Sequence, residues 1–581
     1  MARGRTGAQF VAEMVPAGRR MAARPAFEAG PEVPLIKARR GDARMGDLVT
    51  ARMKGGGCEV VAIHGPSTHA GAAIRALIAH EGLGRGFGPK AREEAQAAAR
   101  TRDEPDADRR DMRDQRAITI DPEGAKDHDD AIAVADEGEG IRLWVHIADV
   151  SRYVAAGGAI DREAERRGCS VYLPGTVDPM LPEILSNDVC SLRPGEDRKA
   201  LTAHMLVMPD GSVTAEGFHR SLIRSDRRLT YPEVDAFLEG RAGLGDAVME
   251  GDVRLAMELA RRLRARRMRR GALDIVTSEP RFRFDGDRVE SVEMETQTDS
   301  HSLIEECMIA ANEAVARFLI AKHVPAIYRV HADPDQVAIE DLWARLEILG
   351  IPVPPLAEGV LTAEQRRDAA GVAAHAVRLQ VERTGEGGAS LPYMVLRSLQ
   401  KAVYRPDETS HSGLASPAYL HFTSPIRRYP DLVVHRALVH ALGLAGAAPD
   451  AAMLPEVARD ASDRERDATD LERRADRMCL AYLLAQSMAG DAWDRPRDGE
   501  VTGIGQAGLF ITFDAVFDGF LPFRNMPDDH YVPDEFSAEA VGEDTGRRFR
   551  LGDPVRVRVN DIQPLRGRVT LEMAERSPRH R

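Results

Sequence analysis

Four aspartates crowd into ten consecutive residues, in the sequence DPEGAKDHDD at 121–130. They are Asp121, Asp127, Asp129 and Asp130. The proline and glycine that follow the first aspartate favour a turn, which would bring it back towards the other three. On extended chain Asp127 and Asp129 share one face, and Asp130 points the other way unless the backbone bends.

Carboxylates at such close quarters repel one another, and the repulsion raises their pKa values. A hard divalent cation removes this cost, so Mg²⁺ or Mn²⁺, held by carboxylate oxygens and water, is the natural occupant. Such an ion activates a water, orients a phosphodiester and offsets charge on the leaving oxygen. Two alternatives are a solvated acidic turn and a calcium loop, although the EF-hand spacing fails because Ala131 and Ile132 follow the last aspartate.

A second segment, YLHFTSPIRRYPD at 419–431, holds Arg427 and Arg428 between two prolines. The pattern predicts a rigid loop that enters a helix over 431–442. Arginine binds phosphate with two parallel hydrogen bonds, so an arginine beside a metal-bound phosphodiester would stabilise charge in the transition state. The alternative is a structural arginine that pairs with a core carboxylate. Nothing in the sequence places this loop near the aspartates, which lie roughly 300 residues earlier.

The N-terminal region has the pattern of a small β domain. Residues 1–66 form short apolar runs broken by glycine and proline, and 1–57 contain eleven Lys or Arg against five Asp or Glu. This favours a nucleic-acid-binding β-barrel, with an unrelated small β domain as the alternative. Helices are predicted over 72–80 and 89–100, and the almost wholly charged run 101–116 is predicted to be a solvated connector.

The rest of the chain divides into three regions with different sequence patterns. Residues 117–440 mix strand and helix patterns, and 253–270 carry eight arginines and one acid on a helical pattern that stops at Gly271. That helix is either a solvated face or a wall that faces phosphate. Residues 441–495 are predicted helical, and 497–575 have five strand patterns that suit a closed barrel.

Composition limits the class of protein. The 581 residues allow three or four domains, and the net charge of −13 excludes a uniformly basic coat but not a local basic channel. None of the five cysteines forms a C-x-x-C pair, which argues against a zinc site or a disulfide framework and favours a reducing compartment. No apolar run approaches the ~18 residues of a membrane span. We expect a cytoplasmic protein without membrane contact.

Six motifs, in this order, resemble those of the bacterial ribonuclease R / ribonuclease II family of RNB-domain exoribonucleases. They read DPEGAKDHDDA, HIADVSRYV, SVYLPG, PMLPEILSNDVCSL, IEECMIAAN and HFTSPIRRYPDL. Several long motifs in a fixed order are far more specific than any one of them. The C-terminal region is similar to the family's S1 domain.

The resemblance implies an α+β fold, in which a central RNB catalytic domain at 117–440 is flanked by small OB-type β-barrels. These are a cold-shock-like barrel at 1–66 and an S1 RNA-binding domain at 497–575. A helical and charged connector at 67–116 and a helical extension at 441–495 complete the expected organisation. The implied activity is processive 3′→5′ hydrolysis of single-stranded RNA to nucleoside 5′-monophosphates, with Mg²⁺ as cofactor and Mn²⁺ as its alternative. A monomer without an obligate protein partner is expected.

The resemblance also assigns roles to individual residues. All four aspartates match catalytic and metal-binding positions; Asp121 and Asp130 match those most directly tied to metal, and Asp129 the one most tied to the chemical step. Arg427 matches the arginine that contacts the scissile phosphate. Three further residues are expected to bind RNA: Tyr172 by stacking on the 3′-terminal base, Glu305 or its neighbour Glu306 near the ribose, and Arg428.

Two departures from the family pattern leave alternatives open. The N-terminal region has room for one cold-shock barrel where the family usually has two, and the stretch GALDI at 271–275 lacks the family's second stacking aromatic. One alternative is a non-catalytic RNA-binding protein on the same scaffold, which would be expected to lack the aspartates. The other is a distributive exonuclease that prefers short oligoribonucleotides.

Overall fold

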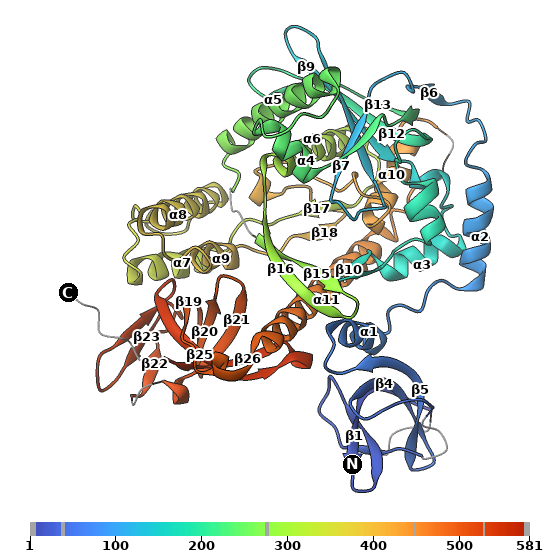
Figure 1. Cartoon of the computed structure of the whole chain (residues 1–581). Helices are drawn as coiled ribbons and strands as arrows, with labels where there is room; N and C mark the ends of the chain where they lie inside the picture. The colour runs from blue at the N-terminus through green and yellow to red at the C-terminus, as the bar shows by residue number, and fades with distance from the viewer. Residues whose placement is uncertain are drawn as a thin grey trace.

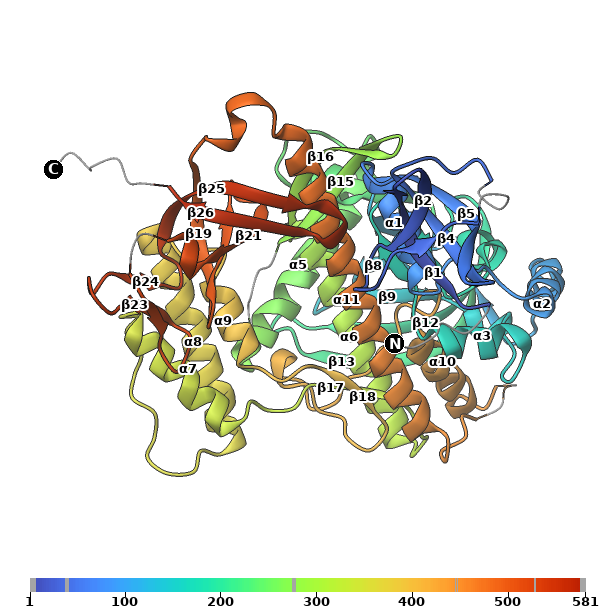
Figure 2. The same cartoon turned by 90° about the horizontal axis from the view of Figure 1, so that it is seen from below.

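A central α+β domain carries two smaller β domains on one side, one from each end of the chain (Figures 1 and 2). The computed structural model describes residues 7–36, 41–273, 278–444, 446, 448–526 and 529–574. Asp274 and Ile275, in the stretch predicted to lack a second stacking aromatic, lie outside these residues. The mixed α+β class with β-rich flanks confirms the fold predicted from the sequence.

The N-terminal β domain is one five-stranded sheet in the order β3-β2-β1-β4-β5. Its strands are β1 (Gln9–Ala17), β2 (Arg20–Pro25), β3 (Val33–Pro34), β4 (Asp47–Lys54) and β5 (Gly57–Pro66). A bridge from Leu35 to Cys58 and a 2.9 Å hydrogen bond from Ile36 N to Cys58 O join the two outer strands. Helices α1 (Ala70–His80) and α2 (Pro89–Arg100) follow, close to the predicted ranges.

A seven-stranded sheet in the order β14-β7-β8-β9-β12-β13-β6 forms the centre of the molecule. Its strands are β6 (Arg109–Asp111), β7 (Ile118–Asp121), β8 (Asp130–Asp136), β9 (Ile141–Ala148), β12 (Asp197–Val207), β13 (Val213–Arg224) and β14 (Arg227–Thr230). On β8, Ile132 packs into one core, and the small residues Ala131 and Ala133 pack into the core on the other face. The alternation follows from the two-residue period of a strand that is buried on both faces.

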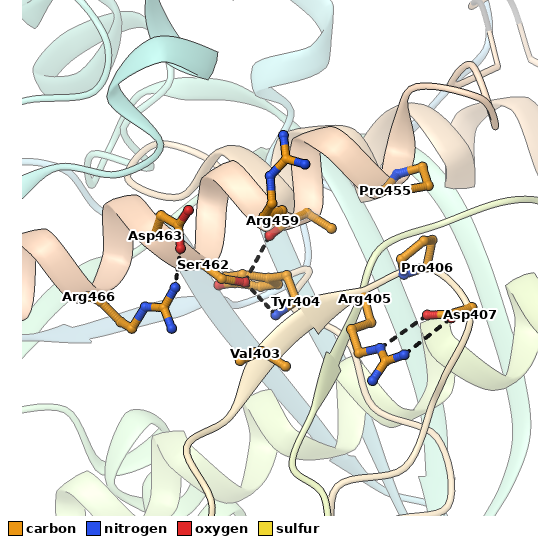
Figure 3. A pocket seen from close by; sticks show the side chains of 11 residues that line it. Val403, Tyr404, Arg405, Pro406, Asp407, Pro455, Arg459, Ser462, Asp463 and Arg466 are labelled. Carbon is orange, nitrogen blue, oxygen red and sulfur yellow. Dashed lines mark hydrogen bonds and ion pairs between the residues drawn. The ribbon is translucent and has the colours of Figure 1, made fainter.

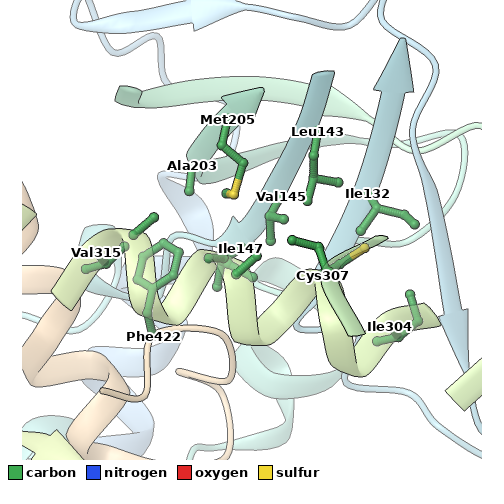
Figure 4. Close-up of a cluster of buried hydrophobic side chains, with 14 of the residues drawn as sticks. Ile132, Leu143, Val145, Ile147, Ala203, Met205, Ile304, Cys307, Val315 and Phe422 are labelled. Carbon is green, nitrogen blue, oxygen red and sulfur yellow. The ribbon is translucent and has the colours of Figure 1, made fainter. Parts of the chain in front are cut away.

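Helices cover both faces of this sheet. They are α3 (Ala159–Arg167), α4 (Tyr231–Leu238), α5 (Ala247–Arg269), α6 (Asp299–Ala321) and α10 (Tyr429–Ala441). Figure 4 shows the larger core, in which Leu143, Val145 and Ile147 of β9 face Cys307 and Val315 of α6. Helix α6, which carries the predicted ribose-contacting Glu305 and Glu306, therefore covers the face of the sheet on which Ile132 lies.

The charged run 101–116 is exposed or half-buried along its length, and it is also fastened to the central sheet. Within it β6 pairs in parallel with β13, and the side chain of Arg109 is only 4% exposed. The Arg109 guanidinium donates to Asp106 at 2.7 Å and to Asp149 at 2.6 Å, while Lys199 lies 3.3 Å from Asp106. Partners that are distant in sequence therefore draw this segment into the domain, because paired charges tolerate burial.

The remaining elements project from the central domain. Two hairpins are β10 (Val171–Leu173) with β11 (Thr176–Asp178) and β15 (Ser278–Asp285) with β16 (Arg288–Thr296). A third two-stranded antiparallel sheet pairs β17 (Tyr328–Val330) with the distant β18 (Val403–Arg405). A helical group comprises α7 (Gln336–Ile348), α8 (Ala363–Thr384) and α9 (Leu391–Arg397). None of the helices in the described ranges is both long and apolar enough to cross a membrane.

One long helix, α11 (Leu454–Ser487), connects the parts of the molecule (Figure 1). Its 34 residues span roughly 51 Å at 1.5 Å per residue. It leads into a closed barrel of β19 (Arg497–Gly505), β20 (Gly508–Phe513), β21 (Phe517–Pro522), β26 (Arg568–Met573) and β25 (Pro554–Gln563). A small sheet of β22 (Tyr531–Pro533), β23 (Glu539–Gly542) and β24 (Arg548–Arg550) is inserted before β25. Tyr482 of α11 also donates to the carbonyl of Ser67, which ties the helix to the N-terminal part.

Candidate active site

The acidic loop joins two neighbouring strands of the central sheet. Asp121 is the last residue of β7 and Asp130 the first of β8, so residues 122–129 form the connection. Asp129 precedes Ala131 by two positions and Asp130 precedes Ile132 by two, so the two carboxylates leave the strand on opposite faces. This is the arrangement that the sequence predicts for extended chain.

The arginine segment lies directly against Asp129. The backbone N–H of Ile426 donates to Asp129 Oδ1 at 2.9 Å, and Arg427 Nε lies 3.4 Å from Asp129 Oδ2. The side chain of Asp129 is 3% exposed, whereas that of Arg427 is 44% exposed. The guanidinium therefore borders the carboxylate and still has a face open to a ligand.

The neighbouring arginine has a different environment. Arg428 donates two hydrogen bonds to Asp431 at 2.8 and 2.9 Å, and Asp431 also accepts from the backbone of Ser424 at 2.8 Å. Asp431 stands in the first turn of α10, so the pair fixes the loop where it enters the helix. These bonds engage the Arg428 guanidinium in the loop itself, and its contact with RNA stays a prediction.

The third segment of the site carries Tyr172 on β10. Its hydroxyl donates to Asp127 Oδ2 at 2.9 Å, and the residue as a whole is 40% exposed. Its backbone N–H donates to Glu472 of α11 at 2.8 Å. Just before β10, Ser170 N donates to the carbonyl of Arg427 at 3.0 Å. The tyrosine, the arginine segment and the acidic loop are thus joined by direct contacts.

The electrostatics of the loop favour a bound cation. Burial raises the pKa of Asp129 well above its ordinary value, even though Arg427 opposes the shift. Desolvation, and then the charge of Asp121, raises the pKa of Asp130 to about 7. Asp121 Oδ2 and Asp129 Oδ2 are buried and accept no hydrogen bond from any described residue, although His128 Nδ1 lies 2.9 Å from the first and Arg427 Nε 3.4 Å from the second. A divalent cation would supply a further partner, and an all-oxygen donor set suits a hard ion.

The carboxylates do not form a complete ligand set by themselves. Across the part of the chain that the structure describes, no three His, Cys, Asp or Glu side chains converge closely enough to hold a metal ion. The donor chemistry and the two buried carboxylate oxygens without hydrogen bonds fit such an ion. The loop supplies the donors without gathering them at one point.

Two glutamates of α6 have distinct surroundings. Glu306 is 3% exposed and pairs with Arg267 of α5 at 2.6 Å, so its carboxylate is committed to the packing of the two helices. Glu305 is 38% exposed, lies 3.7 Å from Arg267 and accepts a hydrogen bond from Gln297. Of the two candidates for a ribose contact, only Glu305 is accessible, although no described contact joins it to the aspartates.

Two residues near the aspartates were missed by the sequence reasoning. His128 is buried, with its Nδ1 2.9 Å from Asp121 Oδ2. Burial, and then the charges of Asp130 and Asp121, raise the pKa of Tyr231 at the start of α4. Its ring stacks on His301 with ring centroids 3.8 Å apart. The histidine stands inside the DHDD string and could have been singled out, whereas no local pattern marks Tyr231.

A pocket of about 420 Å³ lies away from the aspartates, between β18 and α11 (Figure 3). Buried Tyr404 forms its floor and Arg405, Arg459 and Arg466 stand at its rim. Each of these arginines is paired with a carboxylate beside it in the chain. The rim therefore offers little net positive charge to an anion.

Comparisons with known proteins agree with the geometry. The family model described as the RNB domain matches residues 109–443, and the S1 RNA binding domain model matches residues 494–574. The chain is 36% identical to Ribonuclease R of Escherichia coli (strain K12) over 491 residues, which cover 82% of this chain and 59% of that protein. It is 37% identical to Ribonuclease R of Thermotoga maritima over 494 residues, covering 82% of this chain and 66% of that protein.

A solved structure shows the same architecture. Mycoplasma genitalium RNase R, in complex with ribose methylated single-stranded RNA, matches with a TM-score of 0.85 at 24% identity. The match covers 98% of this chain and 90% of that chain. The fold is therefore shared along nearly the whole length, while the chain spans 59% of the length of the E. coli relative.

Proposed function

Because the chain belongs to the RNB family, we propose that it is a 3′→5′ exoribonuclease that degrades single-stranded RNA processively, as a monomer, to nucleoside 5′-monophosphates. One observation carries the proposal. The backbone N–H of Ile426 and the side chain of Arg427 both contact Asp129, which lies roughly 300 residues earlier in the sequence. The predicted limits of the catalytic domain (117–440) and of the S1 domain (497–575) are part of the proposal.

The proposal includes a divalent metal ion. RNB nucleases depend on such an ion, and we propose Mg²⁺ here, with Mn²⁺ as the alternative. Asp121, Asp127, Asp129 and Asp130 would hold it, and when bound it supplies an activated water and compensates charge on the phosphodiester. The two carboxylate oxygens without hydrogen bonds support this assignment.

The chain's own groups have separate tasks in this proposal. Ile426 N–H fixes the orientation of Asp129, and the open face of the Arg427 guanidinium stabilises charge that develops on the phosphate. The exposed ring of Tyr172 stacks on the terminal base, a contact that accepts any base and contributes ~1–3 kcal/mol. Glu305 contacts the ribose 2′-hydroxyl, which distinguishes RNA from DNA.

The test uses a 5′-labelled single-stranded RNA of about 30 nucleotides, with products resolved on a gel. Wild type with Mg²⁺ should yield a short end product with few intermediates, and Asp129→Asn should bind the RNA without cutting it. Asp136→Asn, at the exposed far end of strand β8, which begins directly after Asp129, is the matched control and should behave as wild type. RNA binding without cleavage by wild type, with either Mg²⁺ or Mn²⁺, would replace the enzyme with a non-catalytic RNA-binding protein. A ladder of intermediates would show distributive action.

A further inference from the structure

The loop between Asp121 and Asp127 has no strand pairing to hold it in place. Residues 122–129 contain only a turn, closed by a 3.0 Å hydrogen bond from Ala125 N to Pro122 O. Its second half is fastened by Ser191, whose hydroxyl donates to the carbonyl of Lys126 at 2.7 Å and accepts from His128 N at 3.1 Å. Something else must hold the first half.

Arg228 provides that contact from the edge strand of the sheet. Its Nη2 donates to the carbonyls of Pro122 and Glu123, both at 2.6 Å. Among the described residues, Arg228 is the only group outside the loop that hydrogen-bonds residues 122–125. The nearest other side-chain interaction is a long 3.9 Å approach of Arg281 to the exposed Glu123 carboxylate.

The placement of Arg228 follows from the sheet. Strand β14 runs parallel to β7, with Arg228 opposite Thr119 and Thr230 opposite Asp121. Both strands therefore end at the same edge, where the acidic loop begins. A long side chain from β14 can reach over this edge to the first carbonyls of the loop, and a guanidinium can donate to two acceptors that diverge.

We propose that Arg228 is a positioning residue that fixes the first half of the acidic loop, and thereby the spacing of Asp121 from Asp127, for metal binding. The inference rests on the proposed function, because it assigns the metal to these aspartates. Among the described residues, Arg228 hydrogen-bonds no carboxylate, and in this proposal it acts only through the loop backbone. Loss of such outer contacts typically weakens metal binding or activity by 10–100-fold, and an indirect backbone contact belongs at the low end of that range.

The test measures Mn²⁺ binding to the RNA-free full chain by electron paramagnetic resonance. Arg228→Met should weaken Mn²⁺ binding about tenfold and accelerate amide hydrogen exchange at residues 124–127. The control is Arg227→Met, because the adjacent arginine binds Leu244 O and Glu233 and makes no contact with the loop. This control should leave both readouts at their wild-type values.

Several outcomes are decisive. Unchanged Mn²⁺ affinity in Arg228→Met, with or without a lowered melting temperature, would overturn the proposal and leave Arg228 a structural residue. If that variant does not fold, Arg228→Gln keeps a polar group but is too short for both carbonyls, and the same tenfold loss is expected. If wild type binds no Mn²⁺, the proposed metal site itself fails. Hydrogen exchange at residues 124–127 then still decides whether Arg228 holds the loop.

Discussion

Tyr172 combines two functions in one side chain, and a pair of substitutions should separate them. The exposed ring is available for stacking, while the hydroxyl donates to Asp127 at 2.9 Å. Tyr172→Phe removes only the hydroxyl, and Tyr172→Ala removes both groups. Burial and the neighbouring Asp127 carboxylate raise the pKa of Tyr172, so the hydroxyl stays protonated and acts as a donor throughout the neutral range.

The expected magnitudes follow from the contacts. A hydrogen bond to a charged acceptor contributes about 1.5–3 kcal/mol, and water can partly replace the lost donor because Tyr172 as a whole is 40% exposed. We therefore take the low end, which corresponds to roughly a tenfold slower cleavage step for Tyr172→Phe. The ring is still present, so RNA affinity and the length of the end product should not change. Tyr172→Ala also loses about 1–3 kcal/mol of stacking and should stop at a longer end product.

The assay is single-turnover cleavage of 5′-labelled RNA at saturating Mg²⁺, with the end product sized on the same gel. Cleavage by Tyr172→Phe at the wild-type rate would show that the hydroxyl does not orient Asp127. An end product of wild-type length from Tyr172→Ala would remove the stacking role. The two results are independent, so each half of the reasoning can fail without the other.

Three further predictions concern stability and pH. Arg109→Met should lower the free energy of unfolding by about 1.5–3 kcal/mol in denaturant titrations, because it removes charge-assisted hydrogen bonds to Asp149 and Asp106 and leaves Asp149 with Arg220 at 3.3 Å, whereas exposed Arg110→Met should change it little. Mg²⁺ should raise the melting temperature more at pH 8 than at pH 6, because Asp130, with a pKa of about 7, must lose its proton before it binds the ion; equal shifts would contradict this. Burial lowers the pKa of His146 to about 3, so between pH 6.5 and about 3 the unfolded state binds more protons at this site. His146 should therefore make the protein less stable by about 1.4 kcal/mol per pH unit of acidification, and His146→Gln should flatten that slope in urea titrations.

Local patterns in the sequence were sufficient for much of the fold. The helix predicted over 89–100 has those bounds in α2, and the arginine-rich pattern that stops at Gly271 ends as α5 at Arg269. The ordered motifs identified the family and the two domain types matched by the family models. These signals are short in range, and they depend on residues a few positions apart.

Such local patterns could not predict the contacts between segments that are distant in sequence. The sequence contains no signal that joins Asp129 to Ile426, and none that gives Arg109 its partner Asp149. For this reason the attachment of the charged run to the sheet through Arg109 was not predicted, since charge alone does not reveal whether a partner exists elsewhere. The difference between Arg427 and Arg428 was within reach, because Asp431 stands three residues after Arg428, the spacing at which helix side chains meet.

The crowding of carboxylates in the acidic loop also has an evolutionary consequence. A folded chain that must keep Asp129 desolvated, and Asp130 beside Asp121, is less stable than one with neutral side chains there. Selection for stability alone would therefore remove these residues, while the sheet, α11 and both β domains would keep their own cores. On the proposal that these aspartates hold the metal ion, their retention therefore lowers stability, and an RNA-binding variant with neutral side chains in place of Asp129 and Asp130 should be more stable than this chain.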